Sequence, residues 1–156
     1  MTLADQIVLL KDGEVLQQDS PRQIYNRPSR RFGGWFPGNP GMSFLEHSLD
    51  PKNGPRLRSD LFPFAVSIHH PEVVSKASPT TVVFRVRPEH VRVFTEPRAE
   101  AVEGRILRKF GGVAGQYPVA IQLQDHVVWA KVPSRLGCRL QEQVWFDCPP
   151  EAVILF

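Results

Sequence analysis

The chain has 156 residues, 42% of them hydrophobic, and a formal net charge of +3 at pH 7, which suits one good-sized domain or a small domain with an appendage. Its 15 prolines and 11 glycines argue against a helical bundle, because both residue types break long helices. No stretch approaches the roughly 20 apolar residues of a membrane span, and no basic segment followed by an apolar run opens the sequence, so we expect a soluble protein.

The N-terminal segment predicts a β-hairpin followed by a short helix. Residues 7–10 are a continuous aliphatic run, typical of a strand buried on both faces of a parallel sheet. Because the usual neighbours of such a strand are not in this sequence, we expect it to be frayed, docked on the rest of the chain, or paired in a dimer. Asp12-Gly13 fits a two-residue hairpin turn. Ser20 and Pro21 fit the N-cap and first position of a helix, and Arg27-Pro28 predicts its end.

The next segment predicts a domain boundary. Phe32, Trp35 and Phe36 recur at helical spacing, which favours a packing face over a ligand-stacking site. The residues that follow, 37–41, are proline, glycine and asparagine, which disfavour both helix and strand. We therefore divide the chain into residues 1–36 and residues 37–156.

Short strands separated by turns are predicted beyond this boundary. In residues 117–123, apolar Val119, Ile121 and Leu123 alternate with other residues, so one face of that strand belongs to a core. Asp125-His126 is predicted to form the turn that follows. This spacing is typical of a small barrel or sandwich. The strand candidates are residues 42–46, 62–68, 81–87, 91–95, 102–110, 117–123, 127–132, 143–147 and 153–156.

The cysteines and histidines predict neither a disulfide framework nor a metal site. Cys138 and Cys148 can in principle pair, but one bridge is too few for a disulfide-built secreted scaffold, and we expect two reduced thiols. The histidines are scattered, and adjacent His69 and His70 would point to opposite faces of a strand. No metal is therefore expected.

A nucleotide site of the P-loop type is absent from the sequence. Such a loop needs a glycine-rich backbone followed by a lysine that reaches the phosphates. None of the five lysines follows a glycine, and the glycine cluster at residues 111–115 lacks that lysine. Acids, bases and nucleophiles also show no recognisable catalytic arrangement. We therefore expect no enzymatic activity from this chain.

The order of the motifs resembles the C-terminal part of the ATP-binding subunits of bacterial ABC importers for sugars and other solutes, of the maltose and glycerol-phosphate type. The hairpin resembles the end of the ATP-binding domain, and the later motifs resemble an OB-like regulatory domain often called a TOBE domain. Gly33, Pro37 and Arg85 depart from the family pattern. The motifs that carry the resemblance are Ser20-Pro21, Met42-Ser43-Phe44, Arg87-Pro88-Glu89-His90-Val91, Val102-Glu103-Gly104, Phe110-Gly111-Gly112, Val132-Pro133 and residues 153–156.

This resemblance implies a mainly β fold: an OB-like (TOBE) small barrel with an N-terminal β-hairpin and short helices left from an α/β ATPase domain. It also implies a regulatory, dimer-stabilising region of a cytoplasmic ATPase subunit at the inner face of the membrane. The implied partners are a second copy of the chain, the transporter's membrane subunits, and a small anion, solute or regulatory protein. No cofactor is expected in this chain, because ATP and magnesium would be bound by the missing domain.

Two groups of residues are candidate regulatory ligand sites. Arg85 and Arg87 would share a face of a strand near Glu89 and could recognise a carboxylate, phosphate or sulfate. The alternative is that Arg87 pairs with Glu89 or another acid while Pro88 shapes the strand entry. Residues Gly111, Gly112 and Gly115 could present N–H groups to an oxyanion, or could simply form a hairpin loop.

A mixture of aromatic and basic residues raises an alternative function, a stand-alone OB-type module that binds a small anion or single-stranded nucleic acid. Phe110 and Trp129 can equally belong to the core, and we expect no nucleic acid as partner. Cys138 beside Arg139 could have a lowered pKa, but a lone cysteine is more often structural. The residues of the mixture are Phe110, Tyr117, Trp129, Arg105, Arg108 and Lys109.

Overall fold

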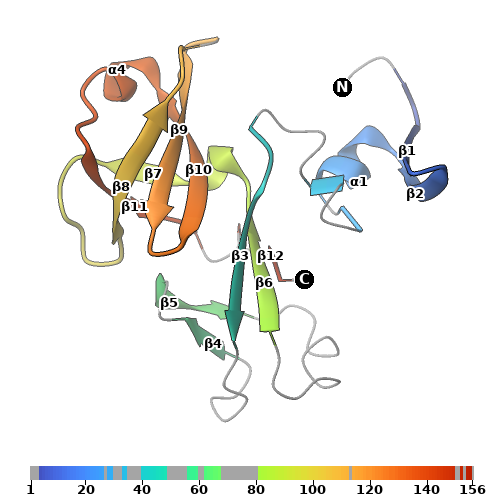
Figure 1. Ribbon diagram of the computed structural model, residues 1–156, viewed down its shortest axis with the longest axis horizontal. Helices are drawn as coiled ribbons and strands as arrows, with labels where there is room; N and C mark the ends of the chain where they lie inside the picture. The colour runs from blue at the N-terminus through green and yellow to red at the C-terminus, as the bar shows by residue number, and fades with distance from the viewer. Residues whose placement is uncertain are drawn as a thin grey trace. The chain divides into compact units, whose positions relative to one another are not determined.

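The computed structural model divides into two compact units, Met1–Met42 and Ser43–Phe156, and each is described by itself (Figure 1). The sequence-based division separates residues 1–36, expected to be left from an ATPase domain, from residues 37–156, expected to form the OB-like domain. This division stays a prediction. The structure describes residues 4–26, 28–29, 33–34, 40–48, 56–59, 62–67, 81–112, 114–149, 152 and 154–155. The expected aromatic face at Phe32, Trp35 and Phe36 lies outside these residues.

The first unit contains the predicted hairpin and helix. Strands β1 (Ile7–Lys11) and β2 (Glu14–Asp19) pair antiparallel. Asp12 and Gly13 connect them with φ angles of 52° and 84°, which confirms the predicted turn. Helix α1 (Pro21–Asn26) follows, and Ser20 Oγ accepts a hydrogen bond of 3.3 Å from the backbone N–H of Gln23. Ser20 therefore caps the helix as predicted.

Strand β1 buries one side chain rather than both faces. Leu9 is 4% exposed, whereas Val8 and Leu10 are 45% and 59% exposed. A methyl group added to Gly33 would lie 3.3 Å from Leu9 Cδ1, so Leu9 packs close to that backbone. The strand was expected to be frayed, docked on the rest of the chain, or paired in a dimer. For Leu9, the structure agrees with docking on the chain. Val8 and Leu10 face solvent, where they add exposed apolar surface.

The second unit is built from antiparallel strands (Figure 1). Five of them form a curled sheet in the order β10-β9-β8-β11-β7. Strands β12, β6 and β3 form another sheet in that order, and β4 and β5 form a hairpin. The bounds are β3 (Ser43–Ser48), β4 (Arg56–Ser59), β5 (Phe62–Ser67), β6 (Thr81–Val86), η2 (Pro88–His90), β7 (Arg92–Phe94), β8 (Val102–Lys109), β9 (Gln116–Leu123), β10 (His126–Pro133), α4 (Ser134–Gly137), β11 (Gln143–Asp147) and β12 (Ile154–Leu155).

Both of these larger sheets contribute to one hydrophobic core. The buried face predicted for β9 is confirmed, because Val119, Ile121 and Leu123 are buried; on the other face Gln122 is exposed but Ala120 is also buried. The backbone N–H of Trp129 on β10 donates a 2.8 Å hydrogen bond to Ser43 Oγ at the start of β3, which ties the two sheets together. The core side chains that are at most 1% exposed are Leu45, Phe84, Val86, Val119, Ile121, Val128, Ala130, Val132, Val144, Phe146 and Cys148.

Every strand range predicted between residues 42 and 156 overlaps an observed strand. The predicted turn at Asp125-His126 was wrong by one residue. His126 already pairs with Leu123, and Gln124, with φ of 51°, opens the turn instead. Strand β4 was not predicted, because its alternating arginines resemble a polar loop. A bulge in β8, between Ile106 and Arg108, was also not predicted.

The two cysteines are free thiols with different surroundings: Cys138 is exposed and Cys148 is buried. Burial and, to a smaller extent, the negative charge of Asp147 raise the pKa of Cys148 to about 12, although the positive charge of Arg92 partly opposes the rise. The folded chain therefore holds this thiol in its neutral form well above the pH at which an exposed thiol ionises.

Stability should consequently fall in alkaline solution. The unfolded thiol ionises near 9.0, so the contribution of Cys148 is fully present below that pH and is lost as pH rises toward about 12. We expect a loss of up to about 1.4 kcal/mol per pH unit. Urea unfolding of the wild type and of Cys148→Ala at several pH values in this range measures the loss. The free energy of unfolding should fall more steeply with pH in the wild type than in Cys148→Ala. Equal pH dependence of stability for the wild type and Cys148→Ala would contradict this origin.

Candidate functional site

The two candidate arginines are both buried on or beside strand β6. Arg85 is 5% exposed and Arg87 is 4% exposed. Burial and, to a smaller extent, the positive charge of Arg87 together lower the pKa of Arg85 to about 10. Both guanidinium groups nevertheless carry their charge at neutral pH. Both side chains also make further interactions within the protein, so their burial alone does not define an open anion site.

Two further charged residues, Glu89 and Arg92, follow this pair closely in the sequence. Glu89 is exposed in η2, and it too makes a further interaction. Arg92 forms a two-pronged ion pair with Asp147, with Nε to Oδ1 at 2.5 Å and Nη2 to Oδ2 at 2.9 Å. The positive charge of Arg92 is therefore directed to Asp147 on β11.

The glycine loop between β8 and β9 is fixed by packing on Tyr117. A methyl group on Gly112 would lie 2.9 Å from the Tyr117 ring, and one on Gly137 would lie 2.8 Å from it. Gly115 has φ of +77°, and its carbonyl accepts a 2.9 Å hydrogen bond from the backbone N–H of Ser134. Gly111 has open space around it. This loop belongs to the five-stranded sheet, whereas Arg85 lies in the sheet of β12, β6 and β3.

The aromatic and basic mixture is divided between the two sides of the sheet. Phe110 and Trp129 are in contact, with ring centroids 5.4 Å apart, and the Arg108 guanidinium lies 5.7 Å from the Phe110 ring centre. Tyr117 instead packs against the core. Lys109 Nζ donates a 2.9 Å hydrogen bond to the carbonyl of Gly137. A small cavity of about 300 Å³ remains beside the ring pair, lined by Leu107, Arg108, Phe110, Ala120 and Trp129.

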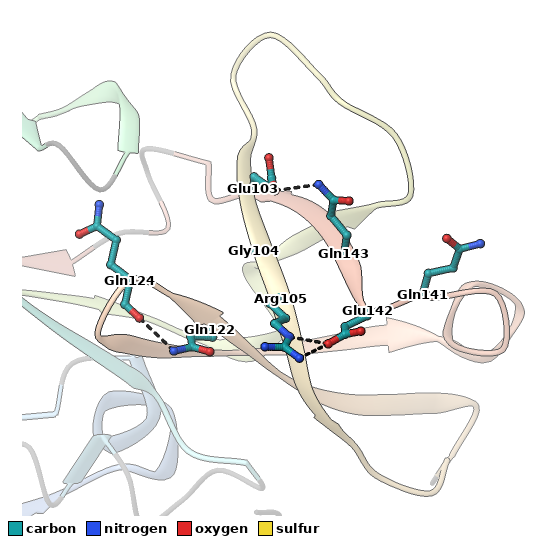
Figure 2. Close-up of a pocket in the computed structure, with 8 residues that line it drawn as sticks. All are labelled: Glu103, Gly104, Arg105, Gln122, Gln124, Gln141, Glu142 and Gln143. Carbon is teal, nitrogen blue, oxygen red and sulfur yellow. Dashed lines mark hydrogen bonds and ion pairs between the residues drawn. The ribbon is translucent and has the colours of Figure 1, made fainter.

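A larger open groove of about 800 Å³ was not predicted from the sequence. Figure 2 shows side chains from β8, from the β9–β10 turn region and from residues 141–143 around it. The only sequence signal is the repeated glutamine spacing at 122 and 124, and at 141 and 143. Those segments meet only because β8 lies between β9 and β11. The groove is lined by Glu103, Gly104, Arg105, Gln122, Gln124, Gln141, Glu142 and Gln143.

In the part of the chain that the structure describes, no three histidine, cysteine or acidic side chains are grouped as they would be to hold a metal ion. Within the same residues, no helix has both the length and the apolar character needed to cross a membrane.

Comparison with known proteins identifies the relatives of this chain. No family model matches the sequence. An uncharacterised ABC transporter ATP-binding protein, y4oS of Sinorhizobium fredii, is 33% identical over 93% of this chain and 37% of its own length. The sulfoquinovosyl glycerol transport ATP-binding protein SmoE of Agrobacterium fabrum is 31% identical over 100% of this chain and 42% of its own length.

The chain is a homologue of ABC transporter ATP-binding proteins. A third relative, the sn-glycerol-3-phosphate import ATP-binding protein UgpC of Chromobacterium violaceum, is 32% identical over 81% of the chain and 35% of its own length. The resemblance read from the motifs is thereby confirmed. The homologue spans only about two-fifths of the length of such relatives.

A solved structure supports the fold of this homologue. The cytoplasmic molybdate-binding protein ModG, with molybdate bound, matches 72% of the chain and 93% of its own chain with a TM-score of 0.56. At 15% sequence identity this similarity concerns the fold alone. The predicted mainly β, OB-like fold is confirmed.

Proposed function

We propose that this chain is the regulatory, dimer-stabilising C-terminal region of the ATP-binding subunit of a bacterial importer for a sugar or another solute. The observation that carries the proposal is the similarity over 93% of the chain to an ABC transporter ATP-binding protein of which it spans 37%. The OB-like fold supports this proposal, because an OB-like unit is a different domain from the one that carries a P-loop nucleotide site. ATP and magnesium would be bound by another part of the subunit.

In this proposal the subunit works at the cytoplasmic face of the membrane with a second copy and with the transporter's membrane subunits. A ligand or protein on the OB-like unit changes transport only if it binds one state of the dimer better than the other. The segment from Arg85 to Glu89 and the glycine loop at Gly111, Gly112 and Gly115 are the proposed regulatory contacts for a small anion. If these two segments instead serve only in packing and in shaping the loop, the proposed dimer-stabilising function of the chain is unaffected.

The outer side of β8 is the proposed dimer surface. Leu107 is 50% exposed and Phe110 is 38% exposed, and both line the small cavity beside Trp129. Exposed apolar side chains of this size gain free energy when a partner covers them. A two-fold dimer would place the same residues of both copies at one interface.

Self-association should therefore depend on Leu107. We expect Leu107→Glu to weaken it at least about tenfold, roughly 1.4 kcal/mol, because a carboxylate would be buried without a partner. Sedimentation of the purified chain over a range of concentrations measures the effect. Gln116→Glu adds the same charge at another exposed position and should leave the dissociation constant unchanged. A wild-type chain that stays monomeric at every concentration would contradict the dimer-stabilising role of this surface.

A further inference from the structure

The open groove has a mixed polar lining that differs from the rest of the five-stranded sheet. Glu103, Arg105 and Gln122 lie on its solvent side, and Gln141, Glu142 and Gln143 close one wall (Figure 2). The volume of about 800 Å³ falls in the range of roughly 300–1,000 Å³ typical of small-molecule sites. The groove uses none of the residues assigned above to the dimer surface or to anion binding.

The charged side chains of the groove disfavour an anion and already have partners within the groove. Arg105 Nε donates a 2.5 Å hydrogen bond to Glu142 Oε1, and Arg105 Nη2 also contacts that oxygen. Glu103 Oε1 accepts a 2.7 Å hydrogen bond from Gln143 Nε2. An anion would meet two carboxylates, and a cation would meet the guanidinium. Because the guanidinium and both carboxylates already have hydrogen-bond partners in the groove, a neutral ligand can enter without separating an ion pair.

Part of the hydrogen-bonding capacity of the groove is unused. Gln122 Nε2 donates a 3.3 Å hydrogen bond to the carbonyl of Gln124. The side-chain amides of Gln124 and Gln141 have no hydrogen-bond partner among the described residues, as Figure 2 illustrates. Each amide offers two donors and an acceptor within a short span. Adjacent hydroxyl groups of a ligand, which donate and accept at once, match this lining.

We propose that the groove binds a neutral polyhydroxylated ligand of the sugar or sugar-alcohol class. The amides of Gln122 and Gln141 contact its hydroxyl groups from opposite sides of β8, and the Arg105–Glu142 pair supplies a fixed donor and acceptor between them. This inference rests on the groove alone and holds whether or not the chain dimerises or regulates a transporter. Of the residues that carry the inference, the sequence analysis singled out only Arg105, as part of the aromatic and basic mixture.

The test is a titration of the isotope-labelled whole chain with maltose, glucose and myo-inositol, followed by nuclear magnetic resonance. At least one of these probes should shift the side-chain amide signals of the groove glutamines in a saturable way. Gln122→Ala combined with Gln141→Ala should weaken that binding at least about tenfold, since two hydrogen-bonding side chains are lost. Gln116→Ala, an exposed glutamine on the same strand β9, is the matched control and should bind as the wild type.

Two results overturn the inference. One is the absence of saturable shifts at the groove with all three neutral probes at millimolar concentration. The other is binding at the groove of glycerol 3-phosphate or putrescine in preference to every neutral probe, which would assign the groove to a charged ligand. Self-association of the chain is not needed for either readout, so this test can fail while the proposed dimer function stands.

Discussion

Replacing Phe146 by alanine should lower the free energy of unfolding of the OB-like unit by about 3–5 kcal/mol. Phe146 is fully buried and lies on β11, which pairs with both β7 and β8. The lost ring would leave a cavity in the core, against a sheet whose strands are held in place by hydrogen bonds. Such a framework can collapse only partly into the space.

Urea unfolding monitored by circular dichroism measures this loss. The dependence of the free energy on urea concentration should be the same in both proteins, which shows that unfolding exposes the same surface area. Phe110→Ala is the matched control, because it removes the same ring from the solvent side of the same sheet, where Phe110 is 38% exposed. We expect that control to cost less than about 1 kcal/mol. Similar losses for both variants would contradict the placement of Phe146 in the centre of the core.

Adding one methyl group at Gly104 should also destabilise the unit strongly, by about 3 kcal/mol at the upper end of the overpacking range. The new Cβ would lie 2.5 Å from Ile121 Cγ2, 3.0 Å from Phe146 Cε1 and 3.1 Å from the backbone carbonyl of Gln122. Side chains can give way, but the strand backbone at Gln122 is held by its pairing with Arg105. Relief of the clash therefore requires β8 and β9 to move apart.

Thermal or urea unfolding of Gly104→Ala tests this clash. Gly111→Ala provides the control, because a Cβ at that position meets no atom within 4 Å and Gly111 has no positive φ. The control should change stability by less than about 0.5 kcal/mol. A Gly104→Ala protein as stable as the wild type would show that β8 and β9 are less closely packed than the structure indicates.

Local rules predicted most of the strands, because each depends on residues close together in the sequence. Alternating Val119, Ile121 and Leu123 specify the buried face of β9 without knowledge of its partners. Asp12-Gly13 specifies a turn because glycine adopts positive φ readily. The turn after β9 was displaced by one residue because Gln124, which has no such preference, adopts the left-handed conformation there.

The candidate sites were harder to predict because they depend on which strands are neighbours. The groove joins residues 103–105 with residues 122–124 and 141–143, and only the strand order β9-β8-β11 brings these segments together. The prediction that the aromatic residues share one surface was only partly correct. Strand alternation puts Tyr117 on the core side of the sheet, while Trp129 and Phe110 are in contact on its outer side. Burial of Arg85 and Arg87 likewise depends on neighbours in the three-stranded sheet.

The bulge in β8 has a consequence for how much surface one strand can carry. Arg105 pairs with Gln122 and Ile106 with Ile121, whereas Leu107 and Arg108 together face Ala120. Consecutive side chains would otherwise alternate between core and solvent, but here Leu107 and Arg108 are both exposed. An apolar group and a cation thus stand side by side at one step of the ladder. Because of the extra residue, β8 exposes more side chains on its outer face than a regular strand of the same length could.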